Sequence, residues 1–110
     1  MSIATEAYLH VLQDMEEEMG RIGLWEAQPP PAEAFSSSVP FCFDSMRFTQ
    51  WLQWVFLPRT RALLEQGGAM PARSQIAPLA EEMFRQLEGD TRQLLALIGE
   101  FDRMINAASA

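Results

Sequence analysis

Apolar residues recur every three or four positions in four separate segments of the chain, the spacing that places them on one face of an α-helix. No segment shows the sustained apolar–polar alternation of a β-strand. The pattern predicts an all-α protein with helices at about residues 2–22, 45–66, 75–88 and 91–107.

Residues that commonly begin or end helices flank these segments. Ser2 is a plausible N-cap for the first helix, and Gly23 follows its last apolar position. Pro78 is compatible with the third helix only if it lies in the first turn, where its missing N–H has no partner to lose. Asp90, with Gln93 three positions later, resembles the capping box of a fourth helix.

The segment between the first two helices, about residues 24–43, contains three consecutive prolines and three consecutive serines. A structureless loop of this length is uncommon in a compact domain, so we expect it to pack along the helices. We therefore predict a single domain over residues 1–110, a four-helix up-and-down bundle with a long packed first loop. The predicted apolar anchors of this loop are Trp25, Phe35, Val39, Phe41 and Phe43.

The second helix holds two of the three tryptophans, Trp51 and Trp54, and is apolar around most of its circumference on a regular helical wheel. This predicts a central helix, beginning at Asp44 or Ser45, whose tryptophans lie in the core. The alternative is an exposed aromatic patch that binds a partner.

Pro58 and Arg59 interrupt this apolar helix. Pro58 removes a backbone N–H and crowds the carbonyl of Trp54, so we expect a kink or local break. On the wheel, Arg59 falls within the apolar arc, where it needs a carboxylate, a freed carbonyl or an escape to solvent beyond the kink. An anion-binding role for Arg59 with Arg47 or Arg61 is the functional alternative. The candidate carboxylates are Glu81, Glu82, Glu100 and Asp102.

Net charge and cysteine content restrict the functional classes. The formal net charge is −7, and only residues 47–73 are positive, with four arginines against one glutamate. A protein that binds a phosphate backbone normally presents a clustered basic face, so we expect no direct nucleic-acid binding. No stretch is apolar enough for a membrane span and the first ten residues do not resemble a secretory signal, so we expect a cytoplasmic protein.

The chain shows no residue spacing typical of a metal site, a catalytic triad or a phosphate-binding loop, so we expect no cofactor and no metal. Cys42 is the one cysteine and His10 the one histidine, the first expected as a packed side chain and the second at the surface. Asp44 is a weak catalytic candidate, because a position at a helix start is explained by capping.

Residues 40–59 resemble the bacterial YqcC-like family, small proteins of unknown function. The matching features are Pro40-Phe41 with Asp44 and Met46, the run Trp51-Leu52-Gln53-Trp54-Val55, and Pro58-Arg59; an Ala77-Pro78 pair agrees as well. Where the family has methionine after Pro-Arg, this chain has Thr60. The resemblance implies a helical bundle and a loose association with tRNA pseudouridine synthase C.

Three functional hypotheses follow. The first is a non-catalytic accessory or adaptor protein that acts through an unknown protein partner, for which a tRNA-modifying enzyme is one candidate. The second is a component of tRNA pseudouridine modification, assisting or acting as a synthase; the third is a bundle that binds a small apolar or anionic ligand. Self-association is also possible. The predicted binding residues are Phe41, Asp44, Arg47, Trp51, Trp54, Pro58 and Arg59.

Overall fold

The computed structural model describes residues 2–108, and every regular element in that range is a helix. This confirms the all-helical class; residues 1 and 109–110 of the predicted domain lie outside the described range. No described helix is both long and apolar enough to cross a membrane. The elements are α1 (Ile3–Arg21), η1 (Ala32–Ser36), η2 (Pro40–Cys42), α2 (Phe48–Trp51), η3 (Leu52–Phe56), α3 (Leu57–Glu65), α4 (Ile76–Phe84) and α5 (Arg92–Ala108).

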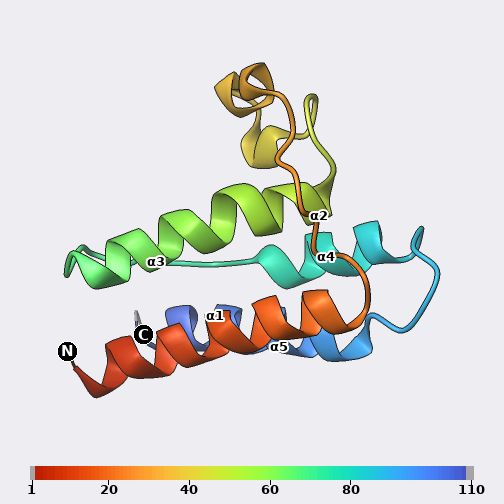
Figure 1. Ribbon diagram of the computed structural model, residues 1–110. Coiled ribbons are helices and arrows are strands. Elements are labelled where there is room, and N and C mark those ends of the chain that lie inside the picture. Colours follow the sequence, from red (N-terminus) through yellow and green to blue (C-terminus); the bar gives the residue numbers. More distant parts are fainter. Residues whose placement is uncertain (1, 109–110) are drawn as a thin grey trace.

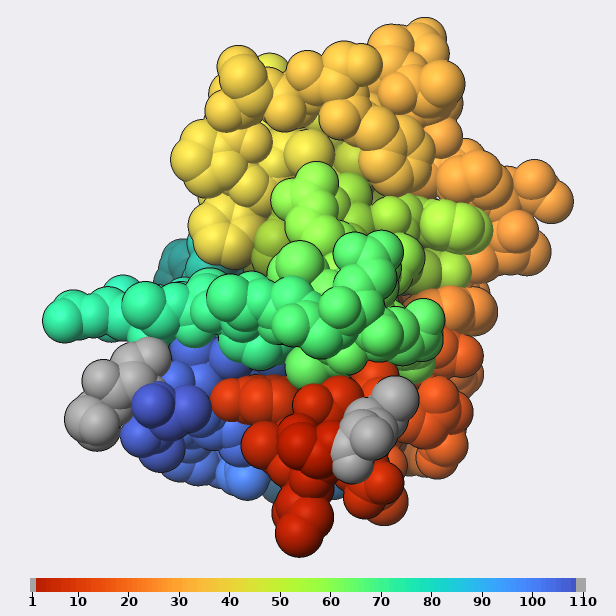
Figure 2. Space-filling model, turned by 90° about the vertical axis from the view of Figure 1, so that its left-hand side faces the viewer, coloured from red at the N-terminus to blue at the C-terminus, as the bar shows by residue number. Residues whose placement is uncertain are grey.

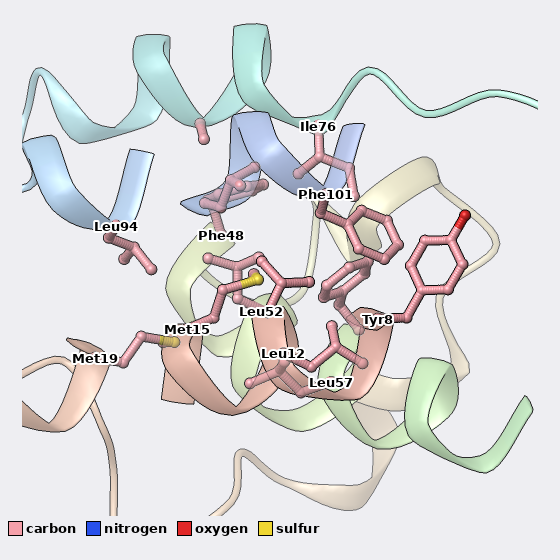
Figure 3. Packing of buried hydrophobic residues seen from close by; sticks show 14 of the residues in the cluster. Tyr8, Leu12, Met15, Met19, Phe48, Leu52, Leu57, Ile76, Leu94 and Phe101 are labelled. Atoms are coloured by element: carbon pink, nitrogen blue, oxygen red, sulfur yellow. The ribbon is translucent and has the colours of Figure 1, made fainter. Parts of the chain in front are cut away.

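The helices α1, α3, α4 and α5 surround one main hydrophobic core. Helix α1 packs against α5 and α3, and α5 also packs against α4 (Figure 1). Figure 3 shows side chains of α1 meeting those of the second helix and of α5. The largest fully buried side chains are Leu12, Met15, Met19, Leu52, Leu57, Leu94, Ile98, Phe101 and Ile105.

Most helix ends follow the sequence signals, but α4 ends at Phe84, four residues before the predicted end near residue 88. The Ser2 hydroxyl accepts a hydrogen bond from the backbone N–H of Thr5 at 3.1 Å, and Gly23 adopts the left-handed conformation with φ 79°. Pro78 is the third residue of α4, within the first turn as predicted. Asp90 lies two residues before α5, one position before the N-cap, and accepts from the backbone N–H of Arg92 at 3.0 Å; no hydrogen bond among the described residues joins it to Gln93, so the predicted capping box is not formed.

The second helix begins at Phe48, later than the predicted start at Asp44 or Ser45. The backbone N–H groups of Ser45 and Met46 both donate to the carbonyl of Cys42 at 3.0 Å, which closes a separate turn. The extended backbone of Arg47 then precedes the helix, and the Gln50 side chain accepts from the Arg47 N–H at 2.8 Å. Local turn bonding therefore takes the place of the first predicted helical turn.

The interruption at Pro58 takes the form of a π-helical turn, η3, between α2 and α3. The Leu57 N–H donates to the carbonyl of Leu52, five residues earlier, and residues 51, 52, 56 and 57 all have helical backbone angles. The helical path from Phe48 to Glu65 is thus unbroken, although Pro58 cannot donate to Trp54. One extra residue in a turn rotates all later residues by about 100° relative to a regular α-helix.

This rotation moves Arg59 off the apolar face, which corrects the regular-wheel prediction. Leu57, Thr60 and Leu64 are buried after the π turn, while Pro58 and Arg59 are exposed. A regular wheel places Thr60 on the polar side of the helix, and the same rotation accounts for its burial.

Residues 25–46 form a lobe that rises from one side of the helices, seen in orange and yellow in Figures 1 and 2. The lobe contains η1 and η2, so it is not structureless, and Figure 1 shows that it projects from the helices and does not run along their length. It covers the outer side of η3, the side that Gln53 occupies.

Candidate functional site

The lobe is attached to the helices through Glu26. The Gln53 side chain, only 3% exposed, accepts from the Glu26 backbone N–H at 2.8 Å and donates to its carbonyl at 2.7 Å. The Glu26 carboxylate also accepts from Gln50 at 3.3 Å and forms an ion pair with Arg47. These bonds fix where the lobe sits relative to Trp51 and Trp54. They give Arg47, a predicted binding residue, a structural partner.

A small second core holds the lobe from within. It consists of Ala34, Met46 and Val55, and the Ser45 hydroxyl donates to the Ala34 carbonyl at 2.7 Å. Most of the predicted anchors are therefore wrong, because the smaller Ala34 and the helix-flanking Met46 take that role. The predicted anchors that are instead exposed are Trp25 (39%), Phe35 (40%), Val39 (40%) and Phe43 (50%).

Phe41 is the predicted anchor that does pack against the helices. Its backbone has φ 61° and that of Cys42 has φ 51°, a left-handed conformation that costs on the order of 1–3 kcal/mol for a bulky residue. This conformation directs the Phe41 ring to the edge of Trp51, with ring centroids 4.8 Å apart. Cys42 is half-buried and contacts the second core.

A chain of aromatic contacts connects the lobe to the main core. Trp51 also lies 5.4 Å from Phe56, and Phe56 meets the edge of Phe101 at 5.1 Å. Trp51 and Trp54 are both half-buried. The two tryptophans are therefore neither fully buried in the core nor part of a fully exposed aromatic patch. Each side chain is partly accessible to solvent.

Two hollows adjoin at Phe41, Trp51 and Arg59. The first, of about 420 Å³, lies between the lobe and η3; it is also lined by Phe35, Val39, Trp54 and Pro58. We name it the lobe hollow. The second, of about 530 Å³, lies between the aromatic chain and the segment that enters α4; Phe56, Phe101 and Arg73 contribute to its lining. We name it the arginine hollow. Neither is lined by an acidic residue.

The indole N–H of Trp54 is buried and has no hydrogen-bond acceptor among the described residues. An unsatisfied buried donor of this kind costs about 1–3 kcal/mol. Other atoms of the half-buried Trp54 side chain contribute to the lining of the lobe hollow.

Arg59 forms no hydrogen bond or ion pair with any described side chain, which excludes a structural ion pair within residues 2–108. The four carboxylates predicted as its partners are engaged elsewhere. Glu81 and Glu82 pair with Arg85, and Glu100 pairs with Arg103. Asp102 accepts from the Ser74 hydroxyl and from the backbone N–H groups of Ile76 and Ala77.

Asp44 lies apart from both hollows. Its exposed carboxylate accepts from the Ser37 hydroxyl at 2.6 Å and does not cap α2, whose N-cap is Arg47. Asp44 and Arg47 line a separate hollow beside the end of α4, with Phe43 and Phe84. The seven predicted binding residues therefore divide into two groups. Only Phe41, Trp51, Trp54, Pro58 and Arg59 come together.

Sequence reasoning missed Asn106 and Arg73 near the arginine hollow, and it assigned Asp102 a different role, as a possible partner of Arg59. Asp102 and Asn106, one turn apart on α5, hold the backbone of residues 74–77, and Asn106 accepts from Ser74 N–H at 3.0 Å. Their spacing on an otherwise apolar helical face was the available signal. For Arg73, the only signal in the sequence was its location in the positively charged segment 47–73.

The geometry defines an all-helical protein with two adjoining hollows at the junction of lobe and helices, and no cluster of metal-ligating side chains exists among residues 2–108. The chain belongs to the DUF446 family, whose profile is described as "tRNA pseudouridine synthase C" and matches residues 7–104.

Two comparisons span most of the chain. An uncharacterized protein of Haemophilus influenzae is 40% identical over 95 residues, covering 86% of this chain and 89% of that protein. The solution NMR structure of protein YqcC from E. coli has a TM-score of 0.86 and 27% identity, covering 99% of this chain and 92% of the other. These likenesses confirm the resemblance to YqcC-like proteins.

A third comparison involves a much larger protein. A Pectobacterium carotovorum protein named tRNA pseudouridine synthase C is 47% identical over 60 residues, which are 54% of this chain but 16% of that protein. The similarity therefore concerns a minor part of the synthase.

Proposed function

We propose that this protein is a non-catalytic accessory module that acts by binding another protein through its lobe. The observation that carries the proposal is the exposure of large apolar side chains. The described residues expose five such side chains, and four of them lie on the lobe: Trp25, Phe35, Val39 and Phe43. Exposed apolar groups concentrated in this way are typical of protein-interaction surfaces.

The lobe hollow supplies further features of an interaction site. Phe35 and Val39 border the same hollow as Trp54 and the unpaired Arg59. Tryptophan and arginine are enriched among the residues that dominate binding energies at interfaces.

We propose tRNA pseudouridine synthase C as the first partner to test. The family description and the segment of the Pectobacterium synthase that resembles this chain both support an association with that enzyme. Because similar sequence occurs within the synthase's own chain, a separate module of this kind is suited to binding the enzyme. This role would place the protein in the cytoplasm.

A direct catalytic role is less well supported. Pseudouridylation requires an aspartate in a cleft that holds a flipped base beside a basic surface. The exposed Asp44 binds Ser37, and the net charge is −7. These features favour assistance over catalysis.

Calorimetry with the purified chain and the synthase of the same organism tests the proposal. The wild-type chain should bind, and the double variant Phe35→Ser/Val39→Ser should bind at least about tenfold more weakly because it loses central apolar contacts. The matched control is Ile3→Ser, which removes the remaining exposed large apolar side chain, 86% exposed and on α1.

The control variant should bind the synthase as the wild type does. Absence of binding by the wild-type chain, or equal binding by the double variant, contradicts the proposal. Binding of tRNA by the chain alone at physiological salt would support the nucleic-acid role instead.

A further inference from the structure

Six of the eight arginines of this acidic chain are paired with carboxylates. The partners lie in the same helix or turn for Arg21, Arg85, Arg92 and Arg103. Arg47 pairs with Glu26 and Arg61 with Glu16, which leaves neither free to form the predicted anion site with Arg59.

The two other arginines, Arg59 and Arg73, form no ion pair with a described carboxylate, and both line the arginine hollow. Fifteen acidic residues are present in the chain, yet none lines this hollow. By contrast, the hollow between α1 and α5 is lined by Glu6, Asp14 and Glu100. The unpaired positive charge of the described residues is thus concentrated at one place.

The remaining walls of the arginine hollow are aromatic. Phe41, Trp51, Phe56 and Phe101 come from the lobe, the second helix and α5, and each ring contacts the next in this order. A volume of about 530 Å³ lies within the range of small-molecule sites. The buried acid Asp102 is engaged by three donors from residues 74–77 and does not line the hollow.

We propose that the arginine hollow is a binding site for a small aromatic or apolar molecule that carries a carboxylate or phosphate. The apolar body lies against the four aromatic rings, and the anionic group is bound by Arg59 and Arg73. Guanidinium groups suit this role because their planar donors match carboxylate and phosphate geometry. The site is additional to the lobe hollow, because Arg73 and Phe56 line only the arginine hollow.

NMR titration of the ¹⁵N-labelled chain with 2-naphthoate tests the site, and the uncharged 2-naphthalenemethanol serves as the matched probe. The signals to follow are the Trp51 indole N–H, the Thr60 amide and the side-chain Nε–H groups of Arg59 and Arg73. We expect saturable shifts of these signals with 2-naphthoate, and affinity for the alcohol at least about tenfold lower.

The double variant Arg59→Gln/Arg73→Gln should lose at least about tenfold in affinity for 2-naphthoate. It breaks no ion pair among the described residues, so it should fold as the wild type does. The control Arg85→Gln/Arg103→Gln removes the same charge from exposed surface pairs of low energy and should bind within about twofold of the wild type.

Equal binding of the naphthoate and the alcohol overturns the proposal, as do unchanged affinity in the double glutamine variant and shifts confined to residues outside the hollow. Absence of any shift at millimolar 2-naphthoate also overturns it. The single variant Arg73→Gln should reduce 2-naphthoate binding while leaving synthase binding intact, because Arg73 does not line the lobe hollow. The two proposals can thus fail separately.

Discussion

The side chain of Gln53 forms two hydrogen bonds with the backbone of Glu26. Its oxygen accepts from the Glu26 N–H at 2.8 Å, and its NH₂ group donates to the Glu26 carbonyl at 2.7 Å. The two residues are 27 positions apart, so this pair holds the lobe against the second helix. A glutamine on the polar side of a regular wheel is buried here because the lobe covers it.

Replacement of Gln53 by leucine should destabilise the lobe. The change leaves the N–H and C=O of Glu26 without partners, which should cost about 1–3 kcal/mol of unfolding free energy for buried groups. Urea unfolding measures the loss, and hydrogen exchange should show faster exchange of the Glu26 amide.

The matched control for this experiment is Gln93→Leu, at an exposed position on α5. It should change the unfolding free energy by less than about 0.5 kcal/mol. If Gln53→Leu and Gln93→Leu behave alike, the hydrogen-bonded pair does not hold the lobe.

Asp102→Asn should destabilise the entry to α4. The Asp102 carboxylate accepts from the N–H groups of both Ile76 and Ala77, at 3.1 and 2.8 Å through different oxygens. Asparagine has one acceptor oxygen, so one of these bonds is replaced by a donor facing a donor, and the unfolding free energy should fall by about 1–3 kcal/mol.

Thermal or urea unfolding measures this loss, with Asp14→Asn on the exposed part of α1 as the control. Equal stability of Asp102→Asn and wild type would show that the contact with α4 contributes little.

Arg92 lowers the pKa of Asp90 well below its ordinary value, chiefly because its guanidinium donates hydrogen bonds to that carboxylate and also because its backbone N–H donates. A pKa that is lower in the folded chain adds stability above the unfolded pKa of about 4, and this stability is lost as the pH falls toward the folded value. Arg92→Gln should therefore raise the pKa of Asp90. As the pH falls below about 4, the unfolding free energy of this variant should then decrease less steeply than that of the wild type.

Carboxyl ¹³C NMR titration measures the Asp90 pKa directly. Arg103→Gln removes an arginine paired with Glu100 and should leave the Asp90 titration unchanged. A low Asp90 pKa that persists in Arg92→Gln would assign the effect to another group.

The sequence predicted the helical class and most helix ends because these depend on local signals. Gly23 adopts positive φ just after α1 ends, and Pro78 lies in a first turn, whereas α4 ends at Phe84, before the predicted end near residue 88. The π turn could not be predicted, because a regular wheel assumes about 100° for every residue. That assumption placed Arg59 on the apolar face and Thr60 on the polar face, and both placements are wrong.

The candidate site was predicted only in part, for a related reason. Phe41, Trp51, Trp54, Pro58 and Arg59 do come together, since most of them share one helix. The lobe anchors depend on tertiary contacts, and size and hydrophobicity alone did not show that Ala34 packs while Phe35 is exposed. Arg73 joins the arginine hollow through the fixed backbone of residues 74–77, a contact with no local signature.

The binding face of the lobe is the central claim, and hydrogen–deuterium exchange with and without tRNA pseudouridine synthase C tests it most directly. We predict that the synthase slows exchange of amides in residues 35–43 and of Arg59, while amides of α1 and α5 keep their free rates. Protection of α1 or α5 with unchanged exchange in residues 35–43, or no protection anywhere, would contradict the assignment.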